Sequence, residues 1–85
     1  MTILEFDDEP PAVDGITPYD ELHLVTYLRL LDAEAEGADW QEVAGIVFDI
    51  DPAIDAARAK AVYDSHLTRA QWIRDSGFRK LLGQI

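Results

Sequence analysis

The stretch that decides the fold is ADWQEVAGIVFDIDPAIDAARAKAVYDSHLTRAQW, residues 38–72, which contains two helical patterns separated by a short break. Asp39-Trp40-Gln41-Glu42 forms a capping-box pattern. In this pattern the carboxylate of Asp39 accepts from the amide three residues on, and the side chain of Glu42 reaches back to the amide of Asp39. The pattern predicts a helix over about 39–48. Its apolar residues share one face, by which the helix should pack: Trp40, Val43, Ala44, Val47 and Phe48.

Asp49-Ile50-Asp51-Pro52 interrupts the helical pattern. Because Pro52 disfavours helix at the residue before it and suits a first turn, Asp51 is the expected N-cap of the next helix. That helix should be long, about 53–75, and Gly77 should end it. Its core-facing positions are Ala56, Ala59, Val62, Tyr63, His66 or Leu67, Ala70 and Ile73. A last short turn with Phe78, Leu81, Leu82 and Ile85 should cover the bottom of the core.

A helix over about 18–36 is expected before this unit. Thr17 is its N-cap, Pro18 its first residue, and Gly37 its stop signal. The spacing predicts a core-facing stripe of Leu24, Val25, Leu28, Leu31 and Ala35. Leu22, Tyr27 and Leu30 lie off this stripe. A helix that is apolar on more than one face packs on two neighbours or leaves part of its surface for a partner.

Residues 1–16 combine an acid cluster at 7–9, the pair Pro10-Pro11 and Gly15, which favours a flexible acidic tail over a packed element. As an alternative, Ile3, Leu4 and Phe6 could dock on the domain or on a partner as a short strand. Residues 17–85 then form one domain. Since no strand alternation occurs, the fold class is a small all-α domain, a helix-turn-helix variant with an extended turn and a long third helix.

The composition suits an intracellular protein. Eighty-five residues support one modest core, and without cysteine the fold depends on apolar packing and helix caps, as in a reducing cytoplasm. Neither a cleavable signal nor a membrane span is expected from the apolar runs. We therefore expect a cytoplasmic monomer that does not associate with membranes.

The charges are sorted along the chain. Residues 1–57 contain fifteen acids and one base, a balance of about −14, whereas residues 58–85 contain two acids and six bases, about +4. The whole chain has a net charge of −10. Such a field repels polyphosphate over most of the surface, and the basic segment is too small to drive strong counterion release from nucleic acid. A protein partner is favoured.

No catalytic or metal-binding pattern stands out. Asp49, Asp51 and Asp55 do not match a calcium loop, because the sixth and twelfth positions counted from Asp49 are isoleucine and lysine. Acids that start a helix are the simpler interpretation. His23 and His66 are far apart in sequence, and His66 is expected to be packed between aromatic residues. We expect neither an enzyme nor a metal site or cofactor.

A short helix, a turn and a longer helix are the order of a helix-turn-helix unit. In a DNA-binding protein of this kind the front of the second of these helices enters the major groove and should offer basic and amide side chains. Here that front carries Asp51 and Asp55, which would face phosphates. The sequence therefore predicts that nucleic acid is not the partner.

Residues 19–82 resemble the RovC-like DNA-binding domain, a helix-turn-helix variant with an extended turn. The resemblance is carried by YLRLLD at 27–32, GADWQEVA at 37–44, SHLTRAQWI at 65–73 and GFRKLL at 77–82. Members fused to a second domain look like transcriptional activators of conjugative-element transfer. In them, the resemblance implies, a basic recognition side binds DNA and the opposite side packs on the fused domain.

We expect this chain to differ from that pattern in two ways, since it should be a stand-alone domain and its recognition side should be acidic. A stand-alone acidic member of the family resembles a quorum-sensing antiactivator of horizontal gene transfer. The resemblance implies that it binds the activator's non-DNA-binding domain and so blocks transcription. An acidic domain that competes for the activator's interdomain contact would not deliver the complex to DNA, which agrees with the charge pattern. The candidate partner-binding residues are aromatic and arginine anchors that could equally form the core: Tyr27, Trp40, His66, Arg69 and Trp72.

Two alternatives stay open. One is a weak DNA-binding transcriptional regulator that uses the basic residues Arg58, Lys60, Arg69, Arg74, Arg79 and Lys80. The other is mimicry of DNA by Asp49, Asp51 and Asp55, which would block a basic surface of the partner.

Overall fold

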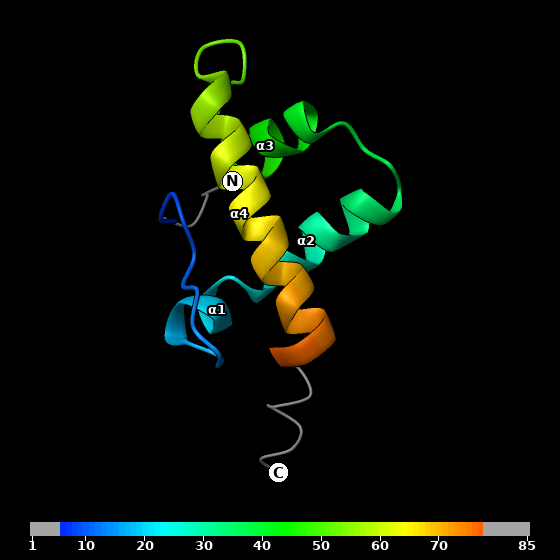
Figure 1. The fold of residues 1–85 in the computed structure, drawn as a ribbon. Coiled ribbons are helices and arrows are strands. Elements are labelled where there is room, and N and C mark those ends of the chain that lie inside the picture. The colour runs from blue at the N-terminus through cyan, green and yellow to red at the C-terminus, as the bar shows by residue number, and fades with distance from the viewer. Residues whose placement is uncertain (1–5, 78–85) are drawn as a thin grey trace.

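The computed structural model describes residues 6–77, which form four α-helices and one short π-helix and, within that range, no strand (Figure 1). The helices are α1 (Pro18–Leu22), α2 (Leu24–Ala35), α3 (Trp40–Phe48) and α4 (Ala56–Trp72), followed by η1 (Ile73–Gly77). The predicted all-α class is confirmed. None of the described helices is long and apolar enough to span a membrane.

The predicted first helix is divided in two at His23. Thr17 and Asp20 form the expected start as a reciprocal capping box, and Gly37 follows α2 with a φ of 72°, which glycine adopts without strain. His23 has φ −106° and ψ 17°, outside helical geometry, and its ring Nδ1 lies 2.8 Å from the carbonyl oxygen of Tyr19. The chain therefore changes direction between α1 and α2.

The predicted core stripe of this region was wrong except for Leu31, which is half-buried and packs against the Tyr27 cluster, while Ala35 is exposed. The buried positions are His23, Tyr27 and Leu30, whereas Leu24, Val25 and Leu28 are exposed. The reason lies outside the helix, because Asp20 accepts a hydrogen bond from the buried hydroxyl of Tyr27 at 2.8 Å and so turns that face inward. Both faces of α2 are apolar, so spacing alone could not choose between them.

Helix α3 agrees with the prediction. Asp39 caps it, although its carboxylate accepts from the amide of Gln41 and not from that of Glu42. Val43, Ala44 and Phe48 are buried, and Trp40 and Val47 pack against them.

The turn after α3 is longer than predicted. Asp51 is not the N-cap of the long helix; its backbone oxygen accepts from the amides of Ile54 and Asp55 in a turn. Asp55 is the cap instead, and its carboxylate accepts from the amide of Arg58 at 3.1 Å. The unit is therefore a helix-turn-helix with an extended turn over residues 49–55.

Helix α4 is the central element, and α2 and α3 lie to one side of it (Figure 1). Its buried apolar positions follow the prediction from Ala59 onward, but Arg69 is buried as well and Ala56 is exposed. The core contains Leu30, Phe48, Ile50, Val62 and Tyr63, and a smaller cluster joins Tyr27, Ala70 and Ile73. The predicted last turn, with Phe78, Leu81, Leu82 and Ile85, lies outside the described residues.

Residues 6–16 contain no helix or strand, and they lie along α4 on the side away from α2 and α3 (Figure 1). The ring of Phe6 meets that of Phe48 edge-on at 5.0 Å between centroids. Ser65 donates to the backbone oxygen of Asp8 at 3.2 Å, and Arg69 donates to that of Val13. Phe6 therefore docks on the domain, as the alternative predicted, although residues 6–16 form no strand. Ile3 and Leu4 lie outside the described residues.

Candidate functional site

The end of the molecule that would read DNA in a helix-turn-helix protein is acidic. Asp49, Asp51 and Asp55 are all exposed in the extended turn. Two of them have local structural roles, because Asp51 accepts from the amide of Ala53 at 2.9 Å and Asp55 caps α4. Asp49 ends α3 in the left-handed conformation, with φ 54°. These acids therefore shape the turn and also give it negative charge.

The described bases of α4 and η1 are each paired with an acid of the same chain. On the surface, Arg58 meets Asp8 at 3.0 Å, Lys60 meets Asp64 at 3.3 Å, and Arg74 meets Asp75 at 2.8 Å. The fourth base, Arg69, is buried against Asp20. Arg79 and Lys80 lie outside the described residues. Within residues 6–77 each base of this stretch therefore has an acidic neighbour that compensates its charge.

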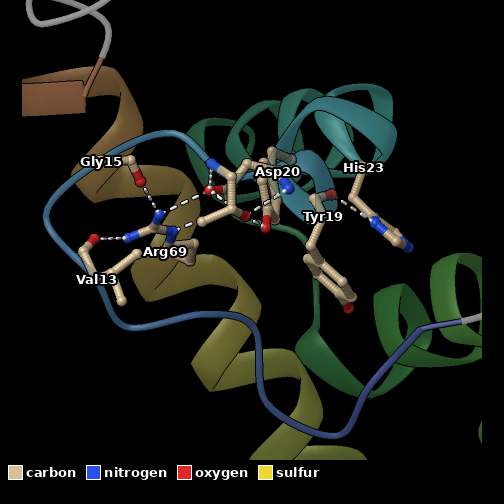
Figure 2. A network of polar contacts seen from close by, with 8 residues as sticks. Val13, Gly15, Tyr19, Asp20, His23 and Arg69 are labelled. Atoms are coloured by element: carbon tan, nitrogen blue, oxygen red, sulfur yellow. Dashed lines mark hydrogen bonds and ion pairs between the residues drawn. The ribbon is translucent and has the colours of Figure 1, made fainter.

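Arg69 and Asp20 are at the centre of a buried polar network (Figure 2). Arg69 donates to both oxygens of Asp20, at 3.0 and 2.7 Å, and also to the backbone oxygens of Val13 and Gly15. Burial by itself raises the pKa of Asp20, but hydrogen bonds from Arg69, Thr17 and Tyr27 outweigh it and lower that pKa to about 2. The network ties α4 to α1 and to the segment before it.

A second buried group surrounds His66. Its Nδ1 lies 2.8 Å from the backbone oxygen of Val62, which can only accept, so Nδ1 is protonated. Its Nε2, at 2.7 Å, then accepts from the hydroxyl of Tyr19, which itself accepts from the amide of Asp7. Burial lowers the pKa of His66. The neutral imidazole therefore acts as a structural link to the N-terminal segment.

The predicted partner-binding residues are not gathered on one surface. Tyr27, His66 and Arg69 are inside the domain, at 2%, 0% and 6% exposure. Trp40 and Trp72 are partly exposed; Lys60 lies over the Trp40 ring at 4.9 Å, and Arg69 lies over Trp72 at 4.3 Å. For the three interior residues the core alternative describes their position.

Two surface features were not predicted as sites. A groove of about 610 Å³ runs between residues 9–14 and α4, with Pro10, Pro11 and Trp72 among its walls. The other is a set of exposed aliphatic side chains on α1 and α2: Leu22, Leu24, Val25 and Leu28. The surplus of apolar residues on the first predicted helix was the signal for this set. Within residues 6–77 no group of three His, Asp or Glu side chains is arranged to hold a metal ion.

The fold and the charged turn together define a small helix-turn-helix domain of the kind found in transcription regulators. The family model described as "T6SS, Transcription factor, DNA binding domain" matches residues 4–83. The chain therefore belongs to this family of RovC-type DNA-binding domains, a class of transcription factors and not of enzymes. No curated protein matches the chain significantly.

Proposed function

We propose that this chain regulates transcription by binding a transcriptional activator and blocking it, without binding DNA itself. The observation that carries the proposal is the charge of the extended turn, where Asp49, Asp51 and Asp55 are exposed at the end that would enter the major groove. In this proposal the domain is an antiactivator that acts by competition between proteins.

The ion pairs of α4 support the same conclusion. DNA binding draws its affinity from basic side chains that neutralise phosphates and release counterions. Arg58 and Lys60 would have to give up Asp8 and Asp64 to do so, and Arg69 is buried. The chain's net charge of −10 adds long-range repulsion from the duplex.

Membership of the family suggests how a domain without DNA contacts could still control transcription. A domain that shares the fold of the activator's DNA-binding domain can take its place against the rest of the activator. The complex then lacks a basic recognition helix and is not delivered to the promoter. The resemblance to stand-alone members suggests quorum sensing and horizontal gene transfer as the setting.

A weak DNA-binding regulator is the second candidate, and the description of the family as a DNA-binding domain favours it. It requires Arg58, Lys60 and Arg74 to exchange their acid partners for phosphates, and the sequence adds Arg79 and Lys80 outside the described residues. Such binding would weaken steeply with added salt.

The test combines a DNA-binding measurement with a transcription assay. Fluorescence anisotropy with labelled promoter duplex at about 50 mM salt should show no binding by the full chain, while the chain reduces activator-dependent transcription from that promoter. Salt-dependent binding to the duplex would support the second candidate and overturn the first.

A triple substitution, Asp49→Asn, Asp51→Asn and Asp55→Asn, separates competition from DNA mimicry. Asparagine keeps the turn and cap hydrogen bonds, because it is as good an N-cap as aspartate, but it removes three negative charges. Competition through another face predicts that inhibition persists. Loss of inhibition with unchanged circular dichroism would support mimicry instead.

A further inference from the structure

We propose that the exposed aliphatic side chains of Leu22, Leu24, Val25 and Leu28, the α1–α2 apolar face, bind an amphipathic helix of the partner that carries lysine or arginine beside its apolar residues. The inference rests on the proposed function and names the surface and the partner chemistry by which it would operate.

The first observation is exposure. Leu22, Val25 and Leu28 are 60–63% exposed and Leu24 is 42% exposed. Residues three and four apart are neighbours on a helix surface, so Leu24, Val25 and Leu28 lie side by side on α2. Single exposed leucines are ordinary, but adjoining ones on so small a domain are typical of a binding surface.

The second observation is that this face is held in a fixed orientation. The opposite face of α2 is anchored by Leu30, which is fully buried, and by Tyr27, whose hydroxyl donates to Asp20 inside the Arg69 network. The helix cannot turn Val25 or Leu28 inward without removing these groups from the core. A surface that is already ordered loses little entropy on binding.

The third observation is charge, which identifies the partner. Asp32 is exposed one helical turn from Leu28 on α2, Glu21 is exposed on α1 next to Leu22 in the sequence, and Arg29 is the one base on these two helices. An apolar surface with an acidic border, on a chain of net charge −10, complements apolar residues bordered by bases. A second copy of the chain would bring the same negative charge and is disfavoured.

The position of the face is consistent with competition. Helix α1 lies beside the C-terminal half of α4, while the acidic turn lies beyond the N-terminal end of α4 (Figure 1). The surface for the partner is thus separate from the end that corresponds to the DNA-reading side. Neutralising the turn and disrupting the apolar face should therefore have independent effects.

The test uses the full chain and a synthetic helical peptide of leucine and lysine, about 18 residues long, with leucines at helical spacing. Two control peptides are a scrambled sequence of the same composition and an amphipathic twin with glutamate in place of lysine. Binding is measured by calorimetry, and contacts by NMR shifts of the methyl groups. The leucine–lysine helix should bind best and shift the methyl signals of Leu24, Val25 and Leu28.

Matched variants make the test specific. Val25→Ser and Leu28→Ser should each weaken peptide binding about tenfold, the loss typical of a contact near the centre of an interface. Ile46→Ser and Ile54→Ser remove aliphatic groups that are still more exposed, on α3 and in the extended turn, and should leave binding unchanged. Shifts centred on the groove at residues 9–14 or on the extended turn, or equal binding of the scrambled peptide, would overturn the inference.

The transcription assay separates the two proposals. Loss of inhibition in Val25→Ser and Leu28→Ser, but not in Ile46→Ser and Ile54→Ser, supports both. If the unmodified chain does not inhibit, the proposed function fails. If the Val25 and Leu28 variants inhibit as well as the unmodified chain, only this inference fails. A dimer in sedimentation that Val25→Ser dissociates would assign the face to a second copy and overturn the choice of partner.

Discussion

Arg69 and Asp20, 49 residues apart in sequence, meet in the interior as a two-point ion pair, with Nε–Oδ1 at 3.0 Å and Nη2–Oδ2 at 2.7 Å. The same guanidinium donates to the backbone oxygens of Val13 and Gly15, so one side chain holds α1 and the N-terminal segment against α4. Tyr27 donates to the same carboxylate and thereby joins α2 to the pair. Four parts of the chain therefore depend on this contact.

The first prediction concerns the removal of Arg69. The substitution Arg69→Met should lower the free energy of unfolding by about 3–5 kcal/mol, because it leaves the buried Asp20 carboxylate without its countercharge. Urea denaturation followed by circular dichroism measures the loss. Arg58→Met is the matched control; its ion pair with Asp8 is exposed and screened by solvent, so the change should cost far less stability than Arg69→Met. Equal effects of the two substitutions would contradict the structural role of Arg69.

The second prediction concerns acid. The pKa of Asp20 is about 2 in the folded chain and 3.8 ordinarily, so the folded state holds this proton less tightly. The stabilisation is complete above pH 3.8 and is lost as the pH falls from there toward 2. The unfolding free energy, measured across this range, should therefore fall more steeply for the unmodified chain than for Asp20→Asn. Parallel profiles would show that Asp20 is not the group responsible.

The third prediction concerns His66. Burial lowers its pKa below the ordinary 6.5. As the pH falls below 6.5, this imidazole therefore binds a proton in the unfolded chain more readily than in the folded chain. Stability due to neutral His66 should thus be complete above pH 6.5 and decline as the pH falls below it. His66→Gln should flatten the profile between pH 7 and 5, and ¹⁵N NMR should find the proton on Nδ1. A proton on Nε2 would contradict the hydrogen bond to Val62.

The fourth prediction concerns Asp49, which occupies the left-handed conformation at the end of α3. Asp49→Gly should raise the free energy of unfolding by up to about 1 kcal/mol, because glycine adopts a positive φ without strain and the change removes an acid from a helix C-terminus. Thermal unfolding provides the measurement. Asp51→Gly is the comparison; it deletes the carboxylate that accepts from Ala53 and should lower stability. If Asp49→Gly instead lowers the free energy of unfolding, the carboxylate of Asp49 stabilises the fold by more than the positive φ costs.

Local signals in the sequence were sufficient for the elements of the helix-turn-helix. Asp39 begins α3, Gly37 follows α2, and the apolar spacing from Ala59 on α4 to Ile73 in η1 predicts the apolar residues that are buried there. Caps and spacing act within a few residues, so a single chain is enough to recognise them. The start of α4 was misplaced because Asp51 and Asp55 are both suitable caps, and the local sequence does not rank them.

By itself, then, the sequence determined the all-α class, a long helix after the turn, which was predicted as the third and is α4 in the structure, and the acids Asp49, Asp51 and Asp55 at the turn and the front of that helix. Only the tertiary structure decided which face of α2 is inside, that Arg69 is buried and not available to a partner, and that residues 6–16 lie against α4. The physical reason is the same in each case. These outcomes depend on contacts between groups far apart in sequence, above all Arg69 with Asp20, Val13 and Gly15, and spacing within one helix carries no information about them.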